Sequence, residues 1–185
     1  MKKSNILSHF AASLVVTILC GAIYVSVQQS HRSVANDPQL QIALDMKNAI
    51  EKNLSLEKWM TKDSIELSGS LSVFKVVYNK IGEPTQSTAL LDGSLPKLPK
   101  GVFDFTRKQK EDVLTWQPRQ GIRMAMVVEA VQSPAIGFVA VGRSLKETEK
   151  RVSNLTLMLF ISWLGCMGVI FIHFLVTWFI RKKSI

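Results

Sequence analysis

The stretch "GFVAVGRSLKETEKRVSNL", Gly137 to Leu155, leads from a predicted strand through a charged helix into an apolar run. Ser144 and Glu147 have the S-x-x-E spacing of a capping box, in which the two side chains satisfy free N–H groups of a helix's first turn. We therefore expect a helix to begin at Ser144, directly at the end of the strand. A single helix over residues 144–180 is about 55 Å long at 1.5 Å per residue. Such a rod can pass a piston, tilt or rotation along its length.

Two segments of the 185-residue chain, 6–27 and 155–180, contain no charged residue. Each is long enough to cross a membrane, because a transmembrane helix needs about 20 apolar residues. The first segment is expected to be an uncleaved anchor, since it exceeds the core of about 7–15 residues of a signal peptide and no A-x-A site follows it. Lipidation at Cys20 is the alternative, but the large Leu19 before it argues against that modification.

Basic residues beside the apolar segments predict the orientation. Lys2 and Lys3 precede the first segment, and Arg181, Lys182 and Lys183 follow the second. Positively charged flanks favour the cytoplasmic side, and long domains are translocated largely regardless of their charge. The predicted organisation is a cytoplasmic N-terminus (1–5), a transmembrane helix (6–27), an extracytoplasmic domain (28–154), a second transmembrane helix (155–180) and a cytoplasmic tail (181–185).

The formal net charge of +9 raises the question of a nucleic-acid partner. All 14 Asp and Glu residues lie in the central domain, together with 18 of the Lys and Arg residues, so the domain's own excess is 18 − 14 = +4. The two signs are interspersed along the chain. We therefore expect a solvated, mildly basic surface and no nucleic-acid partner, with attraction to anionic lipid as the next possibility.

Cysteine and histidine are missing from the body of the central domain. Cys20 and Cys166 lie in the apolar segments, so the domain is expected to fold without a disulfide or thiol nucleophile. His9 and His173 lie in the same segments, and His31 lies in the predicted stalk. We expect no Ser-His-Asp triad, no zinc site and no cofactor, and hence no enzyme. His173 is a functional candidate by virtue of its depth in the membrane.

The central domain shows a helix followed by strands. Asp37-Pro38 predicts a helix start after a hinge at 33–37, and Thr106 with Gln109 predicts a short capped helix. Gly82 in "NKIG" predicts a turn with positive φ. Strands are predicted within 71–84, 87–93, 121–131 and 135–143, the last two joined by "QSPA". The pattern predicts an α+β fold in which an antiparallel sheet of about five short strands carries helices against one face.

Alternation along the third strand sends Ile122, Met124, Met126 and Val128 to one face of the sheet, and Arg123, Ala125, Val127 and Glu129 to the other. The helix that follows the last strand shows a second pattern. Its apolar residues alternate three and four apart, which is typical of a coiled-coil seam and predicts a homodimer. The predicted seam consists of Leu145, Thr148, Val152, Leu155 and Leu159, and we expect the dimer to form through it and the first outer helix. The register continues into the membrane, where small residues on one stripe allow close helix packing, through Ser162, Cys166, Val169, His173 and Val176.

Several stretches carry a resemblance: "YNKIGEP", "LDGSLPKLPKGVFDF", "TWQPRQGIRMAMVV" and "GFVAVGRSLKETEKRVSNL". They resemble the extracytoplasmic sensor region of bacterial two-component histidine kinases, a PAS-like (PDC or Cache) domain between two membrane helices. The resemblance implies a bacterial inner-membrane sensor. In that family the last strand passes into the signalling helix through a G-R-S-L-like step, which Gly142, Arg143, Ser144 and Leu145 occupy here. With Glu147 and Val152, the last three of these are our candidates for signal transmission.

The resemblance also implies a small-molecule ligand on the sheet face opposite the first helix. Tyr78, Trp116, Arg119 and Arg123 are our candidates for binding it, because an arginine fork suits carboxylate or phosphate. The alternative is that Trp116 is core and Arg119 is surface. Carboxylate pairs such as Glu111 and Asp112 are expected on a solvated face.

The sequence departs from the family in one respect, since it contains no phosphoacceptor H-box and no glycine-rich ATP lid. We therefore expect either a stand-alone sensor that acts on a membrane histidine kinase or receptor, or the remnant of a truncated kinase. The rival interpretation is a non-sensory envelope scaffold or accessory subunit of a membrane complex. An enclosed ligand cavity favours the sensor, and a solid interior with an exposed apolar patch favours the scaffold.

Overall fold

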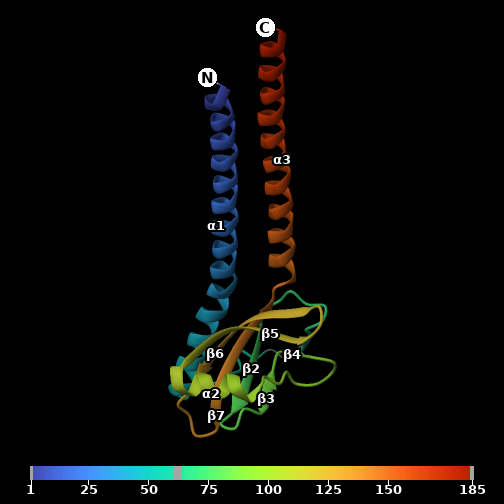
Figure 1. Cartoon of the computed structure of the whole chain (residues 1–185). Helices are drawn as coiled ribbons and strands as arrows, with labels where there is room; N and C mark the ends of the chain where they lie inside the picture. Colours follow the sequence, from blue (N-terminus) through green and yellow to red (C-terminus); the bar gives the residue numbers. More distant parts are fainter. Residues whose placement is uncertain (1, 61–63, 184–185) are drawn as a thin grey trace. The chain divides into compact units, whose positions relative to one another are not determined.

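The computed structural model describes residues 2–60 and 64–183 (Figure 1). Its helices are α1 (Lys2–Glu51), α2 (Lys100–Gln109) and α3 (Lys146–Lys183). The chain divides into two compact units. One consists of Arg32–Glu149, which we call the α+β domain, and the other of Met1–His31 with Lys150–Ile185, which we call the helical unit.

The α+β domain is built on a five-stranded antiparallel sheet in the order β3-β2-β7-β6-β5. Its strands are β2 (Phe74–Asn79), β3 (Pro84–Ser87), β5 (Glu111–Arg119), β6 (Ile122–Ala130) and β7 (Ile136–Ser144). The short strands β1 (Ile65–Glu66) and β4 (Ala89–Leu90) pair in parallel as a separate sheet. The predicted α+β class with an antiparallel sheet is confirmed, and so is the turn at Gly82, whose φ is 87°.

Both faces of the sheet are covered, and each carries an apolar core. Alternate residues of β2 show this, because Val76 belongs to one core and Val77 to the other. On one face Met46 and Ile50 of α1 pack against Val127 and neighbouring valines. On the opposite face Phe103 of α2 packs against the aromatic and methionine side chains. The predicted inward set Ile122, Met124, Met126 and Val128 is confirmed in this second core, whereas the prediction of helices on a single face is wrong.

Helix α1 corrects the predicted hinge. The helix runs through residues 33–37 without a break, and Pro38 lies inside it. Asp37-Pro38 is therefore no helix start, and the side chain of Asp37 lies outside the described part of the chain. A proline within a helix removes one backbone hydrogen bond and costs about 3 kcal/mol. Burial of Ala43, Met46 and Ile50 just beyond it opposes that cost.

The segment between residues 100 and 119 corrects a second prediction. Thr106 does not cap a helix but lies inside α2, fully buried, and its hydroxyl donates to the carbonyl of Val102 at 2.8 Å. The chain then forms β5, a strand that was not predicted from the sequence and that contains Pro118. A proline fits in β5 because this strand lies at an edge of the sheet, where the N–H that proline lacks is not needed.

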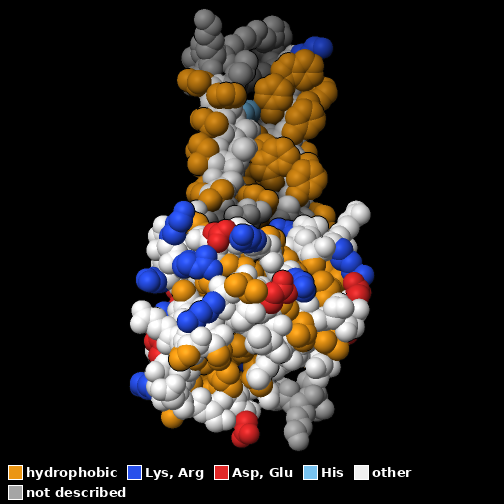
Figure 2. Space-filling view, turned by 90° about the horizontal axis from the view of Figure 1, so that it is seen from below, with side chains coloured by type: hydrophobic (Ala, Val, Ile, Leu, Met, Phe, Trp, Pro, Cys, Tyr) orange, Lys and Arg blue, Asp and Glu red, His pale blue; other side chains and the backbone are white. Residues whose placement is uncertain are grey.

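The helical unit contains the apolar parts of α1 and α3. Over Leu7–Ser30 and Lys146–Ile180 these helices are long and apolar enough to cross a membrane, judged by length and composition. Figure 2 shows hydrophobic side chains over the helices and interspersed charges over the α+β domain. Trp163 Nε1 donates to Thr17 Oγ1 at 3.0 Å, and the rings of His9 and His173 lie 5.1 Å apart. The two helices therefore contact each other within one chain.

The contacts within one chain leave part of the predicted seam exposed. Val152, Leu155 and Leu159 are half-buried, and the next half-buried residue of α3 is Trp163. Ser162, Cys166, Val169, His173 and Val176 are exposed in the single chain. The seam is predicted to join two copies, so these exposed side chains stay available for it, and the homodimer remains a prediction.

Candidate functional site

The junction between β7 and α3 is as short as the sequence predicts. The β7 strand ends at Ser144 and α3 begins at Lys146. The N–H of Leu145 donates to the carbonyl of Arg123 on β6 at 2.9 Å, which continues the sheet ladder by one residue. The carbonyl of Leu145 then accepts the N–H of Glu149 at 2.8 Å, which is the first hydrogen bond of the helix. Leu145 thus connects the sheet to the helix through the hydrogen bonds of its own backbone.

The predicted capping box is displaced by one residue. The hydroxyl of Ser144 accepts a hydrogen bond from the N–H of Lys146 at 3.3 Å. Leu145 takes the N-cap position instead, because its carbonyl accepts the first helical bond. The acidic residues Glu147 and Glu149 lie in the first turn of α3, where negative charge complements the helix dipole.

Charged side chains brace the junction from neighbouring elements. Arg123 of β6 forms an ion pair with Glu149 of α3, and both side chains are close to half exposed. Arg143 donates through Nε to the carbonyl of Leu71 at 3.3 Å. An exposed pair contributes at most about 1 kcal/mol, so these contacts orient the first turn of α3 more than they stabilise it.

The predicted transmission residues lie along this path. Arg143, Ser144 and Leu145 form the junction itself. Glu147 lies in the first turn of α3, and Val152 lies in the part of α3 that belongs to the helical unit, where it is half-buried. The sequence analysis did not place Glu149 here or pair it with Arg123, because their separation of 26 residues gives no local signal.

The structure gives the four predicted ligand residues different surroundings. Tyr78 is a core residue with no exposed surface, and its ring lies 4.9 Å from that of Phe103. Its hydroxyl donates to the carbonyl of Pro96 at 3.0 Å, and burial raises the pKa of the phenol well above its usual range. Tyr78 therefore holds the 94–99 loop against the sheet and is not on an open surface.

The other three candidates do not gather around Tyr78. Trp116 is 6% exposed and lines an open cleft with Leu98 and Pro118. Arg119 is on the surface and forms an ion pair with Asp92 at 2.9 Å. Arg123 lies at the β7–α3 junction. Their predicted assembly into one ligand site thus has no contact to support it among the described residues.

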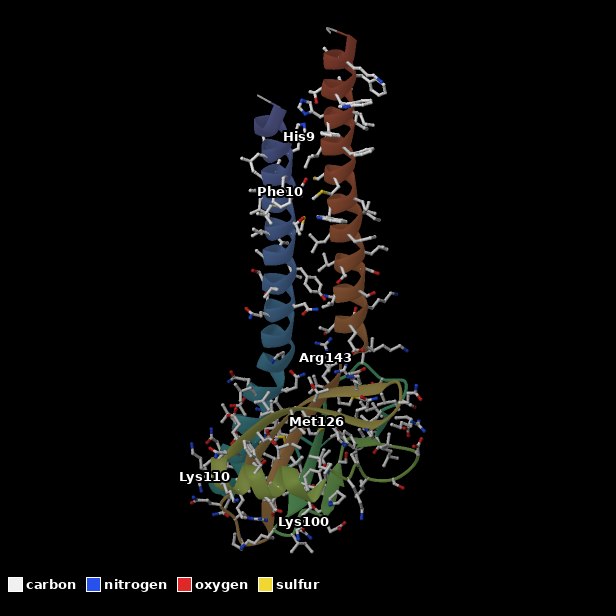
Figure 3. All side chains as sticks on the ribbon, viewed as in Figure 1. His9, Phe10, Lys100, Lys110, Met126 and Arg143 are labelled. Atoms are coloured by element: carbon white, nitrogen blue, oxygen red, sulfur yellow. The ribbon has the colours of Figure 1, made fainter. Side chains whose placement is uncertain are left out.

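A second cleft, of about 270 Å³, lies at the opposite end of β7. It is lined by cationic side chains from three elements, by Glu51 and by the backbone of the β6–β7 hairpin. Figure 3 labels Lys110 of this cleft and Arg143 of the junction, which lie at opposite ends of the domain. We call this feature the basic cleft. Its lining residues are Lys47, Glu51, Lys80, Arg107, Lys110, Ala130, Val131, Gln132, Gly137 and Phe138.

Next to the basic cleft lies a buried carboxylate. Glu129 of β6 has a side chain only 2% exposed and forms an ion pair with Lys47 of α1 at 2.9 Å. Its partner across the β5–β6 ladder is Glu111. Burial raises the pKa of Glu129, Lys47 opposes this effect, and Glu111 adds to it. Glu111 and Asp112 are predicted on a solvated face. That prediction is only partly right, since both residues are half-buried.

Within the described residues, no group of three or more His, Cys, Asp or Glu side chains is arranged to hold a metal ion. No protein-family model matches the chain, and no curated protein matches it either.

Proposed function

We propose that the chain is a membrane-anchored, sensor-type protein that passes a signal from its α+β domain along α3 to a partner. The observation that carries the proposal is the direct junction between β7 and α3, in which Leu145 bonds to both the sheet and the helix. A domain that merely needed an anchor would work equally well on a flexible linker. Here a central strand of the sheet passes into a 38-residue helix across one residue.

The proposal places the domain outside a bacterial inner membrane, with both termini in the cytoplasm. Two apolar helices of sufficient length support a two-pass arrangement. Their outer flanks carry Lys2, Lys3 and the basic run 181–183, which favours cytoplasmic ends. The α+β domain between them is then extracytoplasmic.

Within this proposal the α+β domain is PAS-like. A five-stranded antiparallel sheet supports this assignment, because its first and last strands, β2 and β7, lie side by side at the centre. Helix α1 covers one face of the sheet. The chain acts without catalysis of its own, as a homodimer or with a membrane histidine kinase or receptor. The exposed residues Ser162, Cys166 and Val169 of α3 offer a surface for such a helix.

Crosslinking in native membranes tests the proposal. A photo-crosslinking residue at Val169, which is 68% exposed, samples a membrane partner of α3. The matched control places it at Trp163, which contacts Thr17 in the same chain. Recovery of a histidine kinase, another receptor or a second copy at position 169, but not at 163, supports the proposal. Absence of any crosslinked protein at position 169 argues against a partner for α3.

One observation favours the rival scaffold function. The sheet face predicted to hold a ligand is packed with Phe103, Phe138 and Tyr78, with adjacent ring centroids 4.9 Å apart. Close aromatic packing at this point suits a scaffold better than an enclosed ligand cavity does, and the cleft of about 810 Å³ that Trp116 lines next to the same core is open. Capture of a multi-subunit membrane complex whose assembly fails without the chain would favour the rival function.

A further inference from the structure

We propose that the basic cleft at the hairpin end of β7 binds a small phosphate-bearing anion. This site is distinct from the ligand residues expected from the sequence, since neither Tyr78, Trp116, Arg119 nor Arg123 lines it. The proposal does not depend on the signalling role of α3, because binding is a property of the α+β domain alone.

The charges of the cleft are only partly neutralised. Arg107 pairs with Asp104 at 3.0 Å, and Lys47 pairs with Glu129 at 2.9 Å. For Lys80 and Lys110, the described part of the chain provides no acidic partner in an ion pair. The carboxylate of Glu51 also lines the cleft, where its Oε1 accepts the N–H of Gln132 at 3.1 Å. The four cationic side chains of the lining outnumber this carboxylate, and the two lysines without an ion pair face the cleft from different elements, which attracts an anion.

The backbone holds these two lysines in place. Lys110 has a φ of 76°, a conformation that a non-glycine residue adopts only at a cost. Its N–H donates to the carbonyl of Thr106 at 2.7 Å, and its carbonyl accepts the N–H of Ala130 at 2.9 Å. Glycine adopts this conformation at a helix end with less backbone strain than lysine does. The strained backbone at Lys110 therefore suggests a function for its side chain.

Lys80 is held by a turn and by close packing. The side chain of Asn79 accepts the N–H groups of Ile81 and Glu83 at 3.0 and 2.9 Å. Gly137 of β7 lies so close that an added Cβ would come within 2.6 Å of the Lys80 Cα. The turn and the strand thus form a fixed wall of the cleft, which lowers the entropy cost of binding.

The remaining contacts decide between a phosphate and a planar carboxylate. Arg107 already uses Nη1 for Asp104 and Nη2 for the carbonyl of Lys80 at 3.1 Å. Its guanidinium also lies over the ring of Phe138, 5.4 Å from the centroid. The planar fork that grips a carboxylate is therefore occupied, whereas lysine ammonium groups bind phosphate as point charges.

The volume of the cleft sets the size of the ligand. About 270 Å³ is just below the roughly 300–1,000 Å³ of pockets for drug-sized ligands, so it suits inorganic phosphate or a small phosphomonoester. The same chemistry occurs in a free metabolite and in the headgroup of an anionic lipid. Both sources supply a compact group with several negatively charged oxygens.

Calorimetry on the full chain in nanodiscs of neutral phosphatidylcholine tests this site, with inorganic phosphate as the probe. We expect saturable binding at one site per chain. The double variant Lys80→Gln/Lys110→Gln is expected to bind phosphate at least about 10-fold more weakly, because it loses two charge-assisted hydrogen bonds. Lys80→Arg/Lys110→Arg keeps the charges and is expected to retain binding, which guards against misfolding of the first variant.

The matched control is Lys100→Gln/Lys146→Gln, which removes the same charge from exposed lysines that do not line the cleft. We expect its affinity to change by less than about twofold. Nanodiscs that contain phosphatidic acid form the second arm, in which competition with free phosphate identifies the lipid headgroup as the source. Absence of saturable binding in both arms, or equal losses in the control and the cleft variant, would overturn the proposal.

Discussion

The two ends of strand β7 differ in how they use charge. At its Ser144 end, Arg123 pairs with Glu149 and Arg143 with a backbone carbonyl, so the strand passes into α3 with its neighbouring arginines engaged. At its Ile136 end, the basic cleft keeps two lysines without an ion pair among the described residues. In the proposals above, the Ser144 end of β7 passes a signal into α3 and the Ile136 end binds an anion. One central strand would then connect the binding site to the membrane helix.

The largest expected effect comes from Phe103→Ala, which acts on the cleft end alone. Phe103 is 2% exposed and anchors α2, which carries Arg107 and is followed directly by Lys110, against Phe138. Truncation of a buried phenylalanine costs about 3–5 kcal/mol of unfolding free energy. Urea denaturation measures the loss, and hydrogen exchange is expected to rise in α2 but not in the first turn of α3. The control is Phe105→Ala on the same helix, where the side chain is 50% exposed and the loss is expected to stay below about 0.5 kcal/mol.

A smaller effect is expected from Gly137→Ala. The added methyl group meets the backbone of Asn79 and Lys80 within 2.7 Å, and neither neighbour is a flexible side chain. Overpacking of this kind costs about 1–3 kcal/mol and pushes the Lys80 turn away from β7. Thermal denaturation and phosphate calorimetry measure the two consequences. Gly101→Ala, whose new methyl group meets nothing within 4 Å, is expected to change neither quantity, and equal effects of both variants would contradict this account.

The buried carboxylate predicts a pH dependence of stability. Burial raises the pKa of Glu129 above its ordinary value of 4.5, with Lys47 opposing and Glu111 adding to the shift. The folded state therefore holds its proton more tightly than the unfolded state. The stability this contributes is complete below pH 4.5 and is lost as the pH rises through the raised pKa. Denaturation midpoints between pH 4 and pH 8 measure it, and Glu129→Gln is expected to flatten this part of the profile. An identical profile in the variant would show that Glu129 is not responsible.

The smallest change in stability is expected at the junction, from Arg123→Gln. Since the pair with Glu149 is close to half exposed, the loss is expected to be below about 1 kcal/mol. The effect is local, because the first turn of α3 loses a contact with β6. Hydrogen exchange of residues 146–149 is expected to increase, whereas Arg119→Gln, which breaks the similarly exposed pair with Asp92, leaves these amides unchanged.

The parts of the fold that the sequence predicts well depend on local patterns. The alternation of Met124, Met126 and Val128 follows the pleat of a strand, and Gly82 is suited to its turn. The predictions that failed depend on tertiary context. An edge position tolerates Pro118 in β5, and packing of α1 on the sheet allows its helix to continue through Pro38.

The candidate sites divide in the same way. Leu145 and Ser144 could be placed at the junction because strand and helix adjoin in the sequence. The basic cleft could not be predicted, because Lys47, Lys80 and Lys110 come from separate elements that only the folded sheet brings together. Tyr78 is a ligand candidate only through the resemblance, which implies a ligand on its face of the sheet. Its hydrogen bond to Pro96 and its complete burial place it in the core.

The central claim is that the first turn of α3 is held to the sheet at the β7–α3 junction, so that a change in the α+β domain can pass into the helix. Spin labels at the exposed positions Gln117 and Lys146, in a chain with Cys20 and Cys166 replaced by serine, allow the separation of β5 and the first turn of α3 to be measured by pulsed electron resonance in nanodiscs. The account predicts a single narrow distance distribution, which broadens when Gly-Ser-Gly-Ser is inserted between Leu145 and Lys146. A broad distribution in the chain without the insertion would contradict it and would leave α3 as an anchor alone.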